Sequence, residues 1–172
     1  MREVAQKQLA IMLYKDIQLV NVPSYITRNL NGIDIRDSGI EEVKNRIDFI
    51  RNAIPKKNSL TEQEIEERLK GIRYGVKVAY RGDEFIGLIL WHEKSSEEAY
   101  LWLGACSEQG KGIGSMILES VLEDMKKEGY KKISAKVGKD NIIARRQLEK
   151  YGFIEINSED DVCFMEKKLE NE

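Results

Sequence analysis

"CSEQGKGIGSMILESVLEDM", residues 106–125, places three glycines at alternate positions, Gly110, Gly112 and Gly114, directly before a helical pattern of apolar residues. The apolar strand pattern AYLWLGA, residues 99–105, precedes them. The first N–H groups of a helix have no partner inside the helix and lie at the positive end of its dipole. A strand, a glycine-rich turn and a helix in this order therefore favour binding of an anion such as phosphate. A tight turn between strand and helix is the alternative explanation.

The spacing of these glycines disfavours the common nucleotide loops. A P-loop needs four residues between its first two glycines, whereas Gly104 and Gly110 are separated by five, and Lys111 is followed by another glycine. The pattern Gly110-x-Gly112-x-x-Ser115 resembles a dinucleotide fingerprint only in part. It also lies two-thirds along the chain with one strand–helix–strand passage after it, so the dinucleotide interpretation is weak.

Composition predicts one domain with a sizeable core. The chain has 172 residues, of which 41% are hydrophobic and 34% charged. Its 28 basic and 30 acidic side chains give a net charge of −2, which disfavours nucleic acid as the main partner. Cys106, Cys163 and the single histidine, His92, have no metal-ligand spacing, so no metal site is expected.

Neither a membrane span nor a signal peptide is expected. The longest apolar runs, such as FIGLILW at residues 85–91, are much shorter than a membrane span. The first residues, MREVAQKQ, lack the charged start, apolar centre and small cleavage residues of a signal peptide. We therefore expect a cytoplasmic protein without a membrane partner.

Residue patterns predict a single α+β domain around one mixed sheet. Thr61 and Glu64 have the spacing of a capping box, and Pro55 and Gly129 are expected to end helices. The predicted strands are 31–37, 75–80, 85–91, 99–105, 132–137, 153–156 and 162–169, and the predicted helices are 40–54, 62–71, 113–128 and 141–151. Residues 1–29 are expected to form an N-terminal extension that packs on a domain of residues 30–172.

Two motifs resemble those of the GNAT superfamily of N-acetyltransferases. Residues 109–114, Gln-Gly-Lys-Gly-Ile-Gly, resemble its acyl-CoA-binding motif, and NIIARRQLEKYGF at 141–153 is similar to its second block through Asn141, Ala144, Gly152 and Phe153. The order of elements agrees from about residue 30 to 169. The resemblance implies the GNAT acyl-CoA N-acyltransferase fold, with a central mixed, mostly antiparallel sheet flanked by helices.

The resemblance also implies acetyl-CoA as co-substrate and a set of residues that bind it. In the family, the strand before the motif diverges from its neighbour and binds the pantetheine arm, and the amides of the motif bind the pyrophosphate. Asn141 could equally be only a helix cap, and Arg145 and Arg146 either reach phosphates or face solvent. The implied set is Gly104, Ala105, Cys106, Gln109, Gly110, Lys111, Gly112, Ile113, Gly114, Ser115, Asn141 and Ala144.

The implied reaction is direct transfer of an acetyl group from the thioester to an amine, which must lose a proton before attack. Glu98 is the candidate base because it lies eleven residues before Gln109, where the histone-acetylating branch of the family carries a glutamate. Strand alternation places it on one face with Tyr100 and Trp102. A solvated turn is the alternative role of Glu98, and Glu93 and His92 are the next candidate bases.

Two residues depart from the family or suggest other chemistry. Leu148 stands where many members carry a tyrosine that protonates the leaving thiolate, and Tyr151 on the same helix face could replace it through water or merely pack. Cys106 lies beside a helix N-terminus, which could lower its pKa and permit a minor acyl-cysteine route. A CoA-binding module without catalysis and a Cys106/His92 hydrolase are therefore kept as alternatives.

The acceptor amine is not identified by the sequence. The family's acceptor site corresponds to residues 24–30, 54–75 and 91–97, and the acidic run TEQEIEERL at 61–69 either attracts a cationic amine or is a solvated helix face. A small metabolite, an antibiotic, a protein lysine and a peptide N-terminus all stay open. The acyl chain preference and a homodimer are also left open.

Overall fold

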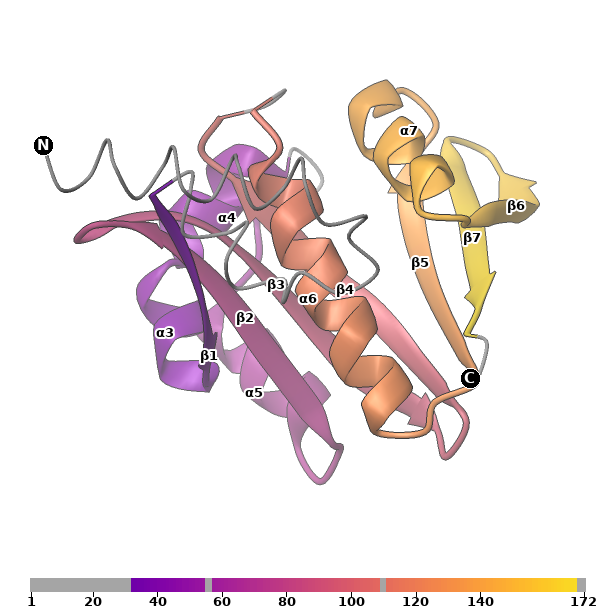
Figure 1. The fold of residues 1–172 in the computed structure, drawn as a ribbon, viewed down its shortest axis with the longest axis horizontal. Coiled ribbons are helices and arrows are strands. Elements are labelled where there is room, and N and C mark those ends of the chain that lie inside the picture. Colours follow the sequence, from indigo (N-terminus) through magenta and orange to yellow (C-terminus); the bar gives the residue numbers. More distant parts are fainter. Residues whose placement is uncertain (1–31, 55–56, 109–110, 170–172) are drawn as a thin grey trace, which may run out of the picture.

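The described chain forms one seven-stranded sheet with helices on both faces. The computed structural model describes residues 32–54, 57–108 and 111–169. The strand order is β1-β2-β3-β4-β5-β7-β6 (Figure 1). The strands are β1 (Ile33–Ser38), β2 (Tyr74–Arg81), β3 (Glu84–Ser95), β4 (Glu98–Cys106), β5 (Lys132–Gly138), β6 (Ile154–Glu159) and β7 (Val162–Lys168). The helices are α3 (Ile40–Asn45), α4 (Ile47–Ala53), α5 (Glu62–Leu69), α6 (Ile113–Lys127) and α7 (Ile142–Lys150).

The sheet is mixed and mostly antiparallel, which confirms the predicted fold class. All neighbouring strands run antiparallel except β4 and β5. These two are parallel because α6 carries the chain back between them as a crossover. None of the helices in the described ranges combines the length and apolar character needed to cross a membrane.

Two apolar clusters lie on opposite faces of the sheet. On one face, α3, α4 and α5 cover β2 to β4 with Val43, Ile50 and Ile65, all fully buried. On the other face, α6 packs along β2, β3 and β4, and its Ile117 and Val121 are fully buried. Figure 1 shows α6 lying across these strands, while α7 lies at the upper ends of β5 and β7.

Capping and glycine positions explain the ends of several helices. Thr61 accepts from the Glu64 backbone N–H at 3.1 Å and Glu64 accepts from the Thr61 N–H at 3.0 Å, so the predicted capping box is present. Gly129 follows α6 with φ of +85°, a left-handed conformation that glycine adopts without strain.

The helix predicted over residues 40–54 is instead two short helices. The break lies at Arg46, whose φ and ψ of −105° and 16° are not helical. The Arg46 guanidinium lies over the ring of Phe85, 4.3 Å from its centroid, and donates to the Tyr80 hydroxyl at 3.3 Å. The break therefore coincides with contacts to β2 and β3, which cannot be predicted from the spacing of apolar residues. The predicted extension, residues 1–29, lies outside the described residues.

Candidate active site

β4 and β5 separate part-way along their length. Their parallel pairing runs from Glu98↔Lys132 to Leu101↔Ala135 and ends there, although β4 continues to Cys106 and β5 to Gly138. The opening between them is visible in Figure 1. Backbone N–H and C=O groups of β4 beyond Leu101 that point toward β5 therefore have no strand partner on that side. This unpaired edge includes Gly104, Ala105 and Cys106. The strand before the glycine motif thus diverges from its neighbour, as the family resemblance predicts.

The strand β4 is also irregular at the point where it leaves β5. Its register against β3 shifts between Leu90↔Leu103 and Trp91↔Leu101, so Trp102 is an extra residue on β4. Such a bulge bends a strand and re-aims its backbone groups, and bulges occur often beside active sites. The bulge and the end of the β4–β5 pairing thus coincide.

The N-terminus of α6 follows the unpaired edge. Gly112 is the N-cap in a left-handed conformation with φ of +80°, no side chain caps the helix, and its first turn has no acidic residue. Apart from Gly112 and its two chain neighbours, no described atom lies within 4 Å of the position that a Cβ on Gly112 would occupy. This end of α6 therefore presents backbone N–H groups, including that of Ile113, to an anion, while the Gly114 backbone N–H hydrogen-bonds the Cys106 thiol. Lys111 is exposed beside it, and Gln109 and Gly110 lie outside the described residues.

The N-terminal turns of α6 contact α7. Gln147 Nε2 donates to Ser115 Oγ at 3.4 Å, and the Tyr151 hydroxyl donates to Glu119 Oε1 at 2.7 Å. A Cβ on Gly114 would lie 2.7 Å from Nε2 at the end of the Gln147 side chain, so a larger residue there would displace this side chain from Ser115. Burial and the bond to Glu119 raise the pKa of Tyr151.

Residues of the second motif mostly stabilise α7 itself. Asn141 Oδ1 accepts from the Ala144 backbone N–H at 3.2 Å, so Asn141 is a helix cap. Arg145 donates to the Lys139 carbonyl oxygen at 3.0 Å and pairs with Glu155 at 3.4 Å, whereas Arg146 is exposed. Leu148, in the position of the family's tyrosine, is buried in the core under α6 and α7.

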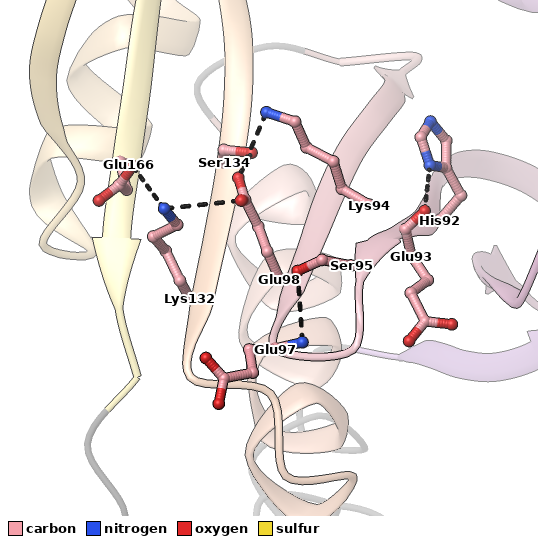
Figure 2. A network of polar contacts seen from close by, with 9 residues as sticks. All are labelled: His92, Glu93, Lys94, Ser95, Glu97, Glu98, Lys132, Ser134 and Glu166. Carbon is pink, nitrogen blue, oxygen red and sulfur yellow. Dashed lines mark hydrogen bonds and ion pairs between the residues drawn. The ribbon is translucent and has the colours of Figure 1, made fainter.

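Glu98 lies on the paired part of β4 and points toward β5 (Figure 2). It accepts from Ser134 Oγ at 2.8 Å, and its carboxylate is 3.4 Å from Lys94 Nζ and 3.5 Å from Lys132 Nζ. Burial alone would raise the pKa of Glu98, but the hydrogen bond from Ser134 and the two ammonium charges outweigh it and hold the pKa below its usual value. Glu98 is thus ionised at neutral pH and screened by two cations.

His92 lies apart from Glu98, in a cluster with Arg68, Tyr100 and Trp102. Figure 2 shows its ring beside the Glu93 carbonyl oxygen. Arg68 Nε donates to His92 Nε2 at 3.1 Å, and the His92 ring is 5.2 Å from that of Tyr100 and 6.2 Å from that of Trp102. Sequence reasoning missed Arg68. It stands at the end of an acidic helix, and no pattern in the sequence links it to β3 and β4.

The thiol of Cys106 is not activated. Burial raises its pKa and outweighs the opposing hydrogen bonds with the Gly114 and Glu108 backbones. The expectation that the helix N-terminus lowers this pKa is wrong, because burial dominates at this position. His92, held by Arg68 on the other face of the sheet, does not join Cys106 in a hydrolase pair, and among the described residues no three His, Cys, Asp or Glu side chains could hold a metal ion.

The acidic run at residues 61–69 has structural partners. Glu64 closes the capping box, Glu66 pairs with Lys44, and Glu67 accepts from Gln63 at 3.0 Å. Glu64, Glu66 and Glu67 are exposed, so they form a solvated helix face.

A family model matches the middle of the chain. The model of the Acetyltransferase (GNAT) family covers residues 45–153, more than half of the sequence, and includes β4, the glycine-rich turn, α6 and α7. The chain belongs to the GNAT acetyltransferase family. No curated protein sequence matches the chain.

Solved structures with the GNAT fold resemble most of the chain. The ribosomal-protein-S18-alanine N-acetyltransferase of Escherichia coli has a TM-score of 0.68 at 18% identity, covering 80% of this chain and 94% of its own. The PaiA N-acetyltransferase of Thermoplasma acidophilum, solved with coenzyme A, has a TM-score of 0.65 at 21% identity, with 79% and 98% covered. A GNAT acetyltransferase of Elizabethkingia anophelis with acetyl-CoA bound has a TM-score of 0.64 at 20% identity, with 81% and 99% covered.

Proposed function

We propose that this protein is an N-acetyltransferase that moves the acetyl group of acetyl-CoA directly to a primary amine. The observation that carries this proposal is the divergence of β4 from β5 after Leu101, next to the uncapped N-terminus of α6. An unpaired strand edge suits a ligand arm with amide groups, and a helix N-terminus suits a diphosphate. CoA has both. The family relatives solved with coenzyme A and acetyl-CoA support the choice of ligand.

In this proposal the chain binds the donor mainly through its backbone. Gly104, Ala105 and Cys106 bind the pantetheine arm at the free edge of β4. Residues 109–114 hold the diphosphate on their amides, with the charge of Lys111 beside it and the Ser115 hydroxyl in the first turn. Asn141 and Ala144, at the start of α7, border the nucleotide side while Asn141 keeps its role as a cap.

The chemistry needs a proton acceptor and a donor for the carbonyl oxygen. The amine nitrogen bonds to the acetyl carbon, the carbon–sulfur bond breaks, and CoA leaves as a thiolate. Unpaired N–H groups of β4 near Trp102 would polarise the carbonyl. Glu98, which is ionised, would take the amine proton through a chain of several bound waters, because four residues of strand, about 13 Å, separate it from Trp102.

The thiolate can leave without a protein acid. A thiol has a pKa near 8.5, so its anion is a fairly stable leaving group. Leu148 cannot donate a proton, and the hydroxyl of Tyr151 is committed to Glu119. We therefore assign the thiolate's proton to solvent.

An assay of the purified protein with acetyl-CoA and a panel of primary amines tests this function. We expect thiol release that depends on the amine, with the N-acetyl product detected by mass spectrometry. Tight CoA binding without acetylation of any amine would overturn the catalytic proposal and favour a CoA-binding module, which no comparison supports. Failure to bind CoA would overturn both.

A further inference from the structure

Arg68 is held at the start of the unpaired edge of β4. Its Cζ lies 4.5 Å from the ring centroid of Trp102 and 5.6 Å from that of Tyr100, and its Nε donates to His92 at 3.1 Å. Trp102 is the first residue of β4 beyond the last pair with β5. The guanidinium therefore lies at the mouth of the opening, on the face of the sheet that α5 covers, opposite α6.

His92 fixes Arg68 without cancelling its charge. Because Nε2 of His92 accepts from Arg68, its hydrogen is on Nδ1, which then donates to the Glu93 carbonyl oxygen at 3.0 Å. Burial lowers the pKa of His92, and the charges of Arg68 and Lys94 lower it further, against the raising effect of the bond to Glu93. The ring is neutral at neutral pH, so it orients the guanidinium and leaves it fully cationic.

No carboxylate of the described residues forms a salt bridge with Arg68. The nearest acidic side chains along α5 are committed elsewhere, Glu64 to the capping box and Glu67 to Gln63. The Trp102 indole N–H is buried and also lacks an acceptor within residues 32–54, 57–108 and 111–169. Among the described residues, this part of the site is thus rich in hydrogen-bond donors and poor in acceptors.

We propose that Arg68 binds a carboxylate of the acceptor, so that the preferred acceptors are amines carrying a carboxylate a few bonds from the nitrogen. The proposal rests on the N-acetyltransferase activity proposed above. A guanidinium fixed at Nε still offers its terminal N–H groups to a carboxylate, and charge-assisted bonds of this kind are the strong ones. The same positive charge lowers the pKa of a nearby ammonium, which favours its deprotonation, and it repels polycationic amines.

Matched pairs of small amines test this preference. The probes are glycine, β-alanine and γ-aminobutyrate, each compared with its own amide. We expect Arg68→Gln to lower the ratio of kcat/KM for carboxylate over amide by about 10- to 100-fold, through KM, with the KM for acetyl-CoA unchanged. Arg68→Lys should keep part of the ratio. Arg36→Gln, which removes a guanidinium bonded to Asp34 on the distant strand β1, should leave it unchanged.

Comparing ratios removes the difference in basicity between an amino acid and its amide, because that difference is the same for every variant. If Arg68→Gln acetylates amines with the wild-type ratio, the carboxylate proposal is wrong while the N-acetyltransferase activity stands.

A binding measurement tests the carboxylate site at Arg68 independently of the N-acetyltransferase activity. The Trp102 indole N–H signal of the CoA-loaded protein is followed by NMR during titration with propionate and with propionamide. A saturable shift with propionate alone, lost in Arg68→Gln, would support anion binding even if no amine were acetylated. Equal responses to both probes, or none, would reject it.

Discussion

The Ser134 hydroxyl of β5 donates to Glu98 Oε1 of β4 at 2.8 Å, inside the only stretch where these two strands pair. Lys94 and Lys132 flank the same carboxylate (Figure 2). These contacts keep Glu98 ionised at neutral pH and on the face that carries Arg68. In the proposed reaction, Glu98 would receive the amine proton on that face through a chain of bound waters.

Glu98→Gln is expected to lower kcat by about 10²-fold or more, since removal of a general base typically costs 10² to 10⁴. The Kd for CoA should change little, because Glu98 lies before the unpaired edge. Glu97→Gln is the matched control, as Glu97 is exposed and pairs with Lys131. Steady-state kinetics across pH measure the effect. Equal kcat and pH profiles for Glu98→Gln and the wild type would remove Glu98 from the mechanism.

His92 should make folding stability depend on pH near neutrality. Its pKa is lowered in the folded protein, so the unfolded chain binds more protons and the free energy of unfolding falls as the pH drops below about 6.5. Because His92 is the only histidine, this loss should be small in His92→Gln. The slope for one proton is at most about 1.4 kcal/mol per pH unit. Urea unfolding of the wild type and of His92→Gln at about pH 7.5, 6.5 and 5.5 measures how the free energy of unfolding changes with pH. The same loss in both proteins would contradict the assignment.

Gly112→Asp is expected to weaken CoA binding at least about tenfold relative to Gly112→Asn. Both side chains are similar in size and both tolerate the left-handed conformation at Gly112, so the comparison isolates the negative charge. Isothermal titration with CoA measures Kd for each variant. Equal Kd values would place the diphosphate elsewhere.

Gly75→Ala is expected to destabilise the fold by about 1–3 kcal/mol. A Cβ on Gly75 would lie 2.5 Å from Nε1 of the buried Trp91 indole, which cannot move without disturbing the core. Gly104→Ala is the control, because its Cβ would be 3.7 Å from Ile89, an ordinary contact. Its free energy of unfolding should stay within about 0.5 kcal/mol of the wild type in urea titrations. Equal losses for the two variants would show that the Trp91 contact is not the cause.

Local sequence signals predicted most of the elements that form the site. The glycines before α6, the capping box at Thr61 and the stop at Gly129 each act within a few residues, so their effects can be read from spacing. The motif at Asn141 likewise predicted α7 and its cap. These features sufficed to predict the fold class and the family.

Features that depend on distant residues could not be predicted in this way. The break at Arg46 falls inside an apolar pattern that continues across it, and it is accompanied by contacts with the distant residues Tyr80 and Phe85. Arg68 meets His92 only because α5 packs on the sheet, so its role has no local signature. The raised pKa of Cys106 is set by burial, which spacing does not report.

The early end of the β4–β5 pairing leaves an unpaired edge of β4 inside the described sheet. The outer edges of the sheet are the outer sides of β1 and β6, where another chain could add a strand. The inner edge of β4 runs along residues 102–106, faces residues 136–138 of β5, and stops at the Leu101↔Ala135 pair. A full strand from another protein would be blocked at that pair, whereas a short linear molecule with amide groups could fill the gap and restore the continuity of the sheet. Bound there, its amide groups would take the place of the backbone hydrogen-bond partners that β4 lacks.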